Sequence, residues 1–287
     1  MIDCRIGPLT PRYAVLGESL PHTWSPFIHN SLFQAAGLDA VYLPITVPKH
    51  QLSSAVDVLR SCFCGFNVTI PYKEQIIPLL DQIDEAATIC GAVNTVENRE
   101  GKLIGHITDG LGMLRAIEEA NICVNQVDAL VLGGGGAARV AAYEFLSRKG
   151  KATIAVRNLE KGKLLANELA DTQPDGISRI NVCQLSDIPG YHDILVNCTP
   201  VGMYPHADDC PVTEETVCRC AAVFDAVYNP RMTQLLAYAA NHRIPYAEGL
   251  GMLFYQAVEA QRFWYPDHTI ASSDDQRKIY LELLKRF

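Results

Sequence analysis

The feature that most constrains this fold is a glycine-rich turn near the middle of the chain. Gly133-Gly134-Gly135-Gly136-Ala137-Ala138 directly follows the apolar run 128–132 and precedes a segment of helical period, 137–148. The hexapeptide fits G-x-G-x-x-A, the turn between the first strand and first helix of a dinucleotide-binding unit. Glycines permit a tight turn and close backbone approach, and the amides that open the helix can donate to a pyrophosphate. We therefore predict a dinucleotide site here; a glycine-rich linker without a ligand is the alternative.

The end of the next predicted strand indicates which dinucleotide is bound. An NAD site usually places a carboxylate there for the ribose hydroxyls, but this chain has Val156-Arg157-Asn158 and no acidic residue before Glu160. A guanidinium forms charge-assisted, often bidentate, hydrogen bonds with phosphate. Arg157 therefore favours NADP, with NAD possible; a merely solvated Arg157 is the alternative.

Strand-like and helix-like segments alternate along the chain, which predicts an α/β fold with parallel strands. The predicted strands are 13–17, 41–45, 65–69, 128–132, 152–156, 194–197 and 222–225, with 92–96 and 102–105 as a hairpin or two short strands. The predicted helices are 26–33, 52–59, 83–89, 137–148, 161–169, 233–240, 250–263 and 279–287. A chain of 287 residues favours two domains. We expect an N-terminal α/β substrate domain (1–113 and 250–287) and a Rossmann-type doubly wound NADP-binding domain (114–249).

Composition limits the classes of molecule that this protein is expected to bind. A net charge of −8 gives no basic field for nucleic acid or an anionic membrane. The start of the chain does not resemble a signal peptide, and no apolar run is long enough to span a bilayer. We expect a cytoplasmic protein, monomer or homodimer, that acts on a small molecule.

Cysteine and histidine spacing argues against a metal site. None of the ten cysteines forms Cys-x-x-Cys, and the pairs Cys62/Cys64 and Cys218/Cys220 are spaced by one residue. Neither spacing suits zinc or a redox motif. His22 and His29 have no third ligand arranged with them, so we interpret both as structural. We expect reduced thiols and no metal.

One lysine and one aspartate suggest the chemistry. Lys73 ends the motif 65–73, Gly-Phe-Asn-Val-Thr-Ile-Pro-Tyr-Lys, and Asp109 lies in 105–110, Gly-His-Ile-Thr-Asp-Gly. An ammonium and a carboxylate ahead of a dinucleotide fingerprint suggest acid/base chemistry beside a hydride carrier, and hence a dehydrogenase. An ordinary surface or capping pair is the alternative.

A series of short motifs resembles the shikimate dehydrogenase family in order and spacing. They are 17–30, 67–73, 91–95, 108–110, the glycine turn, 197–203, 228–230 and 249–256. The segments that fit Asn-Val-Thr-x-Pro-x-Lys and Gly-x-Gly-Met-Leu-x-x-Gln are specific, and the resemblance covers nearly the whole chain. It implies NADP-dependent, reversible reduction of 3-dehydroshikimate to shikimate in aromatic amino acid biosynthesis, in a cleft between domains that closes on its ligands.

The resemblance also implies roles for individual residues. Lys73 would transfer the proton at the reacting oxygen, and Asp109 would orient Lys73. The substrate-binding set would be Thr23 and Ser25 for the carboxylate, Asn67 or Thr69, Asn94 and Gln256 for the hydroxyls, and Tyr228. The cofactor-binding set would be Gly133, Gly134, Gly135, Gly136, Ala137, Arg157, Thr199, Met203, Gly249 and Met252. As alternatives, Thr23 and Ser25 could cap a helix, Asn67 and Asn94 could satisfy loop backbone, and Met203, Met252 and Tyr228 could belong to the core.

The match departs from the family at several positions. Thr23 replaces a serine, Ile107 an asparagine, and Val156 and Asn158 the asparagine and threonine that flank the cofactor arginine. These changes leave open a paralogue that acts on quinate or an aminated shikimate with relaxed use of NAD. A regulator that binds a nucleotide or metabolite without catalysis is a further alternative.

Overall fold

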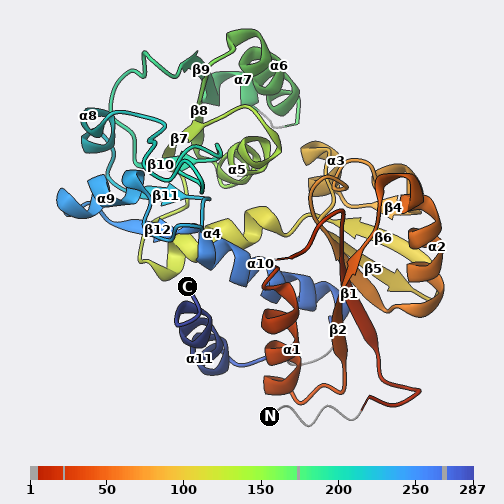
Figure 1. Cartoon of the computed structure of the whole chain (residues 1–287). Coiled ribbons are helices and arrows are strands. Elements are labelled where there is room, and N and C mark those ends of the chain that lie inside the picture. The colour runs from red at the N-terminus through yellow and green to blue at the C-terminus, as the bar shows by residue number, and fades with distance from the viewer. Residues whose placement is uncertain (1–5, 22, 173–174, 267–269) are drawn as a thin grey trace. The chain divides into compact units, whose positions relative to one another are not determined.

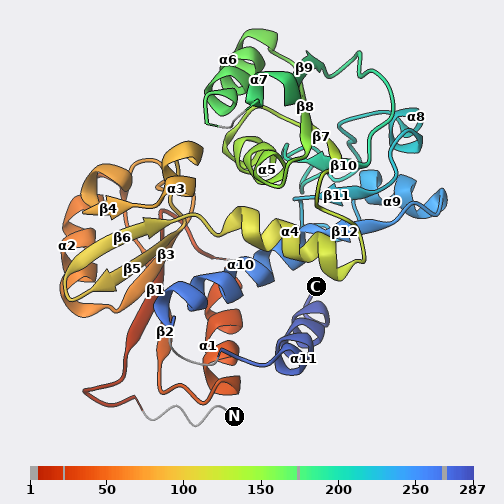
Figure 2. The same cartoon turned by 180° about the vertical axis from the view of Figure 1, so that it is seen from behind.

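The structure, a computed structural model, describes residues 6–21, 23–172, 175–266 and 270–287. The chain separates into two compact units, one of Met1–Thr108 with Gln256–Phe287 and one of Asp109–Tyr255 (Figures 1 and 2). We call them the first and the second unit. The domain limits expected near residues 113 and 250 fall inside helices α4 (Asp109–Glu119) and α10 (Gly249–Trp264), and they stay a prediction.

The first unit is built on a mixed six-stranded sheet with the order β2-β1-β3-β5-β6-β4. Its strands are β1 (Arg12–Gly17), β2 (Val41–Thr46), β3 (Gly65–Val68), β4 (Gln82–Ile83), β5 (Thr95–Arg99) and β6 (Lys102–His106). Parallel pairing, as predicted, joins β1 to β2 and to β3. Strand β5 runs antiparallel to both β3 and β6, so β5 and β6 form the hairpin predicted for this part of the chain. The short β5–β6 connection explains this, because a tight turn can join only antiparallel neighbours.

Helices cover both faces of this sheet. They are α1 (Ser25–Ala35), α2 (Leu52–Cys62), α3 (Glu85–Cys90), α11 (Ser273–Leu284) and the C-terminal part of α10, with short 3-10 turns η1 (Lys49–Gln51) and η2 (Ile77–Leu79). Phe33 of α1 and Trp264 of α10 pack with Tyr13 and Tyr42 of the sheet in one buried aromatic cluster. Helix α2 lies on the opposite side of the sheet from α1 (Figures 1 and 2). This core holds the carboxyl ends of β1 and β3 in fixed register.

The second unit is a six-stranded parallel sheet with the order β12-β11-β10-β7-β8-β9. Its strands are β7 (Asp128–Leu132), β8 (Lys151–Val156), β9 (Ile180–Gln184), β10 (Ile194–Asn197), β11 (Val223–Asp225) and β12 (Tyr246–Glu248). The chain leaves β7 toward β8 and β9, then returns to β7's other side with β10. This reversal is the switch point of a doubly wound sheet, where ligands bind at the carboxyl ends of the strands. The predicted Rossmann-type architecture is confirmed.

Alternating side chains along β7 bury both faces of the second sheet. The helices of this unit are α4, α5 (Gly136–Ser147), α6 (Leu159–Ala170), α7 (Gly176–Arg179), α8 (Glu214–Cys218) and α9 (Gln234–Asn241). Leu130 and Leu132 join Leu235 and Leu236 of α9 in one core cluster. Because successive strand side chains point to opposite faces, Val131 is directed to the other side. Strand β7 is therefore covered on both faces, which is why its sequence is an uninterrupted apolar run.

Across the described ranges, none of the helices combines the length and the apolarity that crossing a membrane would require.

Candidate active site

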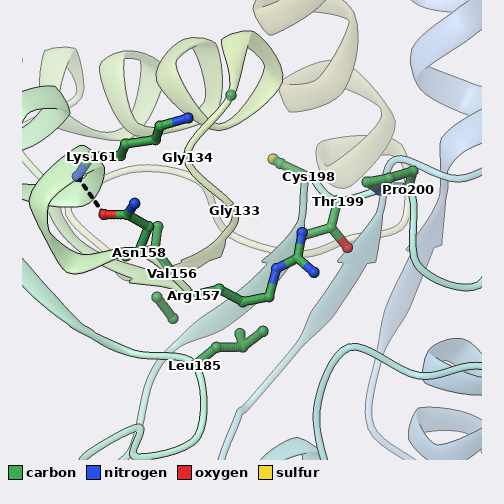
Figure 3. Close-up of a pocket in the computed structure, with 12 residues that line it drawn as sticks. Gly133, Gly134, Val156, Arg157, Asn158, Lys161, Leu185, Cys198, Thr199 and Pro200 are labelled. Atoms are coloured by element: carbon green, nitrogen blue, oxygen red, sulfur yellow. Dashed lines mark hydrogen bonds between the residues drawn. The ribbon is translucent and has the colours of Figure 1, made fainter.

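A cavity of about 370 Å³ lies at the switch point of the second unit (Figure 3). Its lining comes from the ends of β7, β8 and β10 and the loop after β9, and consists of Gly133, Gly134, Gly135, Ala155, Val156, Arg157, Asn158, Lys161, Leu185, Cys198, Thr199 and Pro200. A larger neighbouring cavity of about 750 Å³ shares Arg157 and Leu185 with it. The structure thus gathers the glycine turn, Arg157 and Thr199, which are far apart in the sequence, around one space.

The glycines of the turn are required for different reasons. Gly133 has φ +115°, a conformation that L residues rarely adopt, and a Cβ there would lie 3.2 Å from Thr199 Cγ2. A Cβ on Gly134 would lie 3.1 Å from Val156 Cγ1. At Gly135 and Gly136, by contrast, a Cβ would meet no protein atom within 4 Å. The protein itself therefore does not demand glycine at the last two positions.

The start of α5 offers free donors beside this open space. Gly135 is its N-cap residue and supplies no side-chain cap, and the helix begins at Gly136. The first amides of a helix have no partner within the helix and carry the positive end of its dipole. An uncapped helix end above side-chain-free glycines fits a pyrophosphate. The residues present therefore suit a dinucleotide.

Two cations line the cavity, and sequence reasoning identified only one of them. Lys161 joins Arg157 in the lining (Figure 3). Asn158 begins α6 as its N-cap, and its Oδ1 accepts a hydrogen bond from Lys161 N at 3.2 Å. Glu160, the first acid after β8, is exposed and pairs with Lys163 at 3.1 Å. The signal for Lys161 was its position four residues after Arg157, in the first turn of a helix that follows a strand end.

Val156 shows why an apolar residue precedes Arg157. A Cβ on Gly162 of α6 would lie 2.7 Å from Val156 Cγ2, so the helix packs directly on this side chain. Together with the contact at Gly134, Val156 fixes the spacing between the glycine turn and α6. Val156 therefore determines the shape of this part of the cavity wall.

Loop 198–200 forms the wall of the cavity next to the first glycine of the turn. Asn197, buried at the end of β10, accepts hydrogen bonds through Oδ1 from Thr199 N at 3.0 Å and Thr199 Oγ1 at 2.7 Å. Burial raises the pKa of the Cys198 thiol to about 12, with the negative charge of Asp225 contributing. Cys198 is therefore a neutral thiol at physiological pH and acts as a packing residue of this wall.

In the first unit, a buried polar cluster is centred on Asn94. Asn94 Oδ1 accepts a hydrogen bond from Thr108 N at 2.8 Å, and Asn94 Nδ2 donates to Thr108 Oγ1 at 3.0 Å and to Gln256 Oε1 at 3.4 Å. Two of the expected hydroxyl ligands, Asn94 and Gln256, thus meet although 162 residues separate them. Thr108 was not among the expected site residues, and its position directly before Asp109 was the available signal.

Asn67 has its hydrogen-bonding groups engaged within the protein. Its Nδ2 donates to Asn94 O at 3.1 Å and to Thr95 Oγ1 at 3.0 Å, and its Oδ1 accepts from Tyr42 Oη at 2.6 Å. An amide nitrogen has two hydrogens, so both donors are used. A substrate oxygen could therefore accept from Asn67 Nδ2 only by replacing one of these bonds. Both donors of Asn67 thus serve the protein's own structure, whereas Thr69, the other expected alternative, is partly exposed.

His29 lies beneath Asn67 as a structural residue. It is fully buried, and its ring stacks on Tyr42 with centroids 4.1 Å apart. Its Nδ1 lies 3.4 Å from Gln261 Nε2. Burial lowers the pKa of His29 to about 3, so the imidazole is neutral near pH 7. His22 lies outside the described residues. In the described ranges, no group of three or more His, Cys, Asp or Glu side chains is placed to hold a metal ion.

The remaining expected substrate residues of the first unit lie where β1 and β3 end. Thr69 N donates to Leu16 O at 2.9 Å, extending the β1–β3 pairing by one residue, and Val93 N donates to Lys73 O at 2.8 Å, which ties Lys73 beside Asn94. Thr23 and Ser25 precede and begin α1, but neither is its N-cap, which is Trp24. Thr23 Oγ1 accepts a hydrogen bond from Ser25 N at 3.4 Å. The capping alternative therefore does not hold in the structure.

The other expected residues lie in the second unit. Asp109 is the first residue of α4. Met203 and Tyr228 are 47% and 38% exposed, so neither belongs to the core. Gly249 begins α10, where a Cβ would lie 2.5 Å from Ala226 O, so close packing requires glycine there. Gly136, Ala137, Met203, Gly249 and Met252 are not among the residues that line the 370 Å³ cavity.

Comparison with known proteins gives one consistent picture. Residues 15–96 match the family model described as the shikimate dehydrogenase substrate binding domain. A shikimate dehydrogenase (NADP(+)) of Methanothermobacter thermautotrophicus is 40% identical over 254 residues, which cover 87% of this chain and 89% of that protein.

Solved structures agree over almost the whole chain. Shikimate 5-dehydrogenase from Thermus thermophilus, in complex with NADP(H) and shikimate, superposes with a TM-score of 0.84 at 29% identity and covers 95% of this chain and 99% of its own. The ligand-free 5-ketofructose reductase of Gluconobacter sp. strain CHM43 has a TM-score of 0.86 at 29% identity and covers 96% of this chain and 100% of its own. The same fold therefore carries enzymes named for different substrates.

Proposed function

Because this chain belongs to the shikimate dehydrogenase family, we propose that it catalyses the reversible, NADP-dependent reduction of 3-dehydroshikimate to shikimate. The observation that carries the proposal is the cavity of the second unit, which is lined by the glycine turn, with the uncapped helix end at Gly135, and by two cations. A dinucleotide with a phosphate on its adenosine ribose matches this set of donors and charges. The relatives named shikimate dehydrogenase support the choice of substrate.

The cofactor side of the proposal rests on charge. Arg157 and Lys161 line the cavity, and the nearest acid along the chain, Glu160, is exposed and paired with Lys163. Two cations favour a 2′-phosphate, and no carboxylate is placed among the described lining residues to accept bonds from the ribose hydroxyls of NAD. We therefore propose NADP as the preferred cofactor, with Lys161 added to the binding residues expected from the sequence.

The substrate side rests on the polar groups of the first unit. Hydroxyls of Thr23 and Ser25 would bind the carboxylate, and Thr69, Asn94 and Gln256 would bind ring hydroxyls. The Asn94 cluster is buried and mutually hydrogen-bonded, so its orientation is set before substrate arrives. A site built to pair with specific hydroxyls rejects analogues that lack them.

Lys73 and Asp109 carry the proposed proton chemistry. When bound, NADP(H) would supply or accept the hydride at the substrate's carbonyl carbon. Reduction at that carbon leaves alkoxide character on its oxygen, which a positioned ammonium stabilises and protonates. Lys73 is proposed as this group, and Asp109 as the carboxylate that orients it. In the oxidative direction the same lysine would take up the hydroxyl proton.

The test is a kinetic matrix read by nicotinamide absorbance. Shikimate, quinate and the alcohol obtained by reducing 5-ketofructose would each be oxidised with NADP and with NAD, and kcat/KM compared. We expect the highest value for shikimate with NADP. Preference for quinate or NAD would instead make Thr23 and the residues beside Arg157 the specificity determinants. Tight NADP binding without turnover of any substrate would favour the regulatory alternative.

Lys73→Ala tests the catalytic assignment. Loss of a positioned proton donor typically costs about 10²–10⁴ in rate, so we expect kcat to fall by that order while the dissociation constant for NADP changes less than about threefold. Lys102→Ala, an exposed lysine on β6 of the same unit, is the matched control and should keep wild-type kcat. Near-normal turnover in Lys73→Ala would remove this residue from the mechanism. A cytoplasmic location and a monomeric or homodimeric state stay predictions.

A further inference from the structure

Asp225, a residue with no role in the function proposed above, sits at the centre of a buried polar network. It ends β11 and is 0% exposed. Its Oδ1 accepts hydrogen bonds from Asn197 Nδ2 at 2.9 Å and Val227 N at 3.0 Å, and its Oδ2 accepts from Thr233 Oγ1 at 2.6 Å. Three donors, one from the end of β10 and two from the loop after β11, therefore converge on one carboxylate.

The first of these donors links Asp225 to the wall of the cofactor cavity. An ionised carboxylate can only accept hydrogen bonds, so Asn197 must turn its NH₂ group toward Asp225. The oxygen of the same amide then faces Thr199 and accepts from both its N–H and its hydroxyl. Rotating this amide by half a turn would set its NH₂ against the Thr199 N–H and its oxygen against the Asp225 carboxylate, and both contacts are repulsive. The charge on Asp225 thus selects one conformation of loop 198–200, which lines the cavity.

The other two donors fix the segment that carries Tyr228. Val227 and Thr233 lie on either side of it, and both donate to Asp225. Thr233 Oγ1 also accepts from Leu236 N at 3.3 Å, which caps α9. The two loops are joined directly as well, because Tyr204 N donates to Asn229 O at 3.1 Å. One carboxylate therefore orders both loops that follow β10 and β11.

The hydrogen bonds to Asp225 favour its ionised form, whereas burial opposes ionisation. Burial raises the pKa of Asp225 to about 6, while the bonds from Thr233, Val227 and Asn197 act in the opposite direction. The titratable groups that face it are Cys198 and Cys210, whose thiol pKa values its charge helps to raise. Glu248, its register neighbour on β12, is neutralised by Arg231 at 2.9 Å. No cation among these neighbours pairs with Asp225, so its three hydrogen bonds are what hold the ion.

We propose that Asp225 is a positioning residue for the cofactor site: its carboxylate fixes the amide orientation of Asn197, and through it the Cys198–Pro200 wall, while it anchors the segment from Val227 to Thr233. The inference deepens the proposed function, because it rests on a dinucleotide occupying the cavity of the second unit. It does not rest on the identity of the substrate.

Substitution of Asp225 separates positioning from simple stability. Asp225→Ala leaves the Asn197 and Val227 donors unpaired, so the Asn197 amide no longer holds the Cys198–Pro200 wall in one conformation. NADPH should therefore bind at least about tenfold more weakly at pH 7.5. Val223→Ala, on the same strand and equally buried, is the control. It should lower the melting temperature and leave the dissociation constant for NADPH within about twofold of wild type.

Asp225→Asn provides a second variant, because an asparagine side chain has nearly the shape of aspartate but carries no titratable carboxyl. In the wild type, affinity for NADPH should fall as pH drops through about 6, because a neutral carboxyl accepts weaker hydrogen bonds from Asn197 and Val227 and holds the Asn197 amide less firmly. The 2′-phosphate of the ligand also titrates near pH 6, so the informative quantity is the ratio of wild-type to Asp225→Asn affinity at each pH. That ratio should decrease from pH 7.5 to pH 5.

The outcomes are distinct. An Asp225→Ala protein that binds NADPH like the wild type, or a wild-type to Asp225→Asn ratio that is constant from pH 5 to 7.5, would overturn the inference. If Asp225→Ala fails to fold, the ratio still decides. Direct binding by titration calorimetry needs no turnover, so failure to oxidise shikimate would refute the proposed substrate and leave this test intact. Failure of the wild type to bind any nicotinamide dinucleotide would remove the premise of both.

Discussion

Adding a methyl group at Gly135 should weaken cofactor binding with little effect on folding. The backbone there has φ −99°, which L residues adopt freely, and a Cβ would meet no protein atom within 4 Å. Alanine is a poorer N-cap than glycine, so Gly135→Ala should lower the free energy of unfolding by only about 0.5 kcal/mol. Its methyl would project into the space that a pyrophosphate needs for close approach to the turn.

The size of the binding loss follows from the contact that the methyl prevents. A hydrogen bond to a charged group contributes about 1.5–3 kcal/mol. Losing one such bond at about 2 kcal/mol raises the dissociation constant roughly thirtyfold. The assay is titration calorimetry with NADPH, paired with urea unfolding of the free protein.

Neighbouring glycines provide the controls for this experiment. Gly133→Ala forces a positive φ and places Cβ near Thr199, so it should destabilise the free protein by about 1–3 kcal/mol. Gly136→Ala lies at the first helical position, also with open space around it, and should raise stability by up to about 1 kcal/mol. Wild-type NADPH affinity in Gly135→Ala would refute the reasoning, because the dinucleotide could not then lie against this turn.

Two further predictions concern charge. Arg157→Ala should reduce kcat/KM with NADP by roughly thirtyfold, because it removes one charge-assisted bond of about 2 kcal/mol. It should change kcat/KM with NAD by less than about threefold. The control is Lys163→Ala, which removes a lysine paired with Glu160, and equal losses with both cofactors would place Arg157 away from the 2′-phosphate. Burial holds the pKa of His29 near 3, below its unfolded value of about 6.5, so the unfolded chain binds the extra proton and stability should fall as pH drops from about 6.5 toward 3. Urea unfolding of the wild type and His29→Asn between pH 4 and 8 measures this, and identical slopes would contradict it.

The local elements of the second unit were predictable because local residues determine them. The apolar run of β7, the glycines and the helical period of α5 are adjacent in sequence, so turn and helix could be placed without knowing the rest of the fold. Short edge elements were not predicted. Strands β9 (Ile180–Gln184) and β12 (Tyr246–Glu248) alternate polar and apolar residues over few positions, and only pairing with β8 and β11 makes them strands.

Helix α4 was missed for a different reason. Gly110 and Gly112 interrupt its first turn and resemble a loop. The structure explains Gly110, because a Cβ there would lie 2.6 Å from Glu144 Cγ on α5. Close packing of two helices, and not flexibility, therefore requires this glycine. A contact between residues so distant in the chain leaves no local signal.

Some residues of the candidate site were also predictable from the sequence, and others were not. Residue types and spacing indicated Lys73, Arg157 and the glycine turn, and the family resemblance indicated Asn94, whereas Lys161 required knowing where α6 begins. Only the structure shows that Asn67 forms hydrogen bonds with Tyr42, Asn94 and Thr95. The same holds for Asp225, which appears in the sequence as the polar end of a short apolar strand.

The most direct test of the central claim is transfer of deuterium from substrate to cofactor. Shikimate carrying deuterium at the carbon that becomes the ketone would be incubated with NADP and the protein, and both products analysed by mass spectrometry. The account predicts equimolar 3-dehydroshikimate and NADPH, with the deuterium on the nicotinamide of NADPH. Binding of NADP without formation of either product, or reduced cofactor that carries no deuterium, would contradict it.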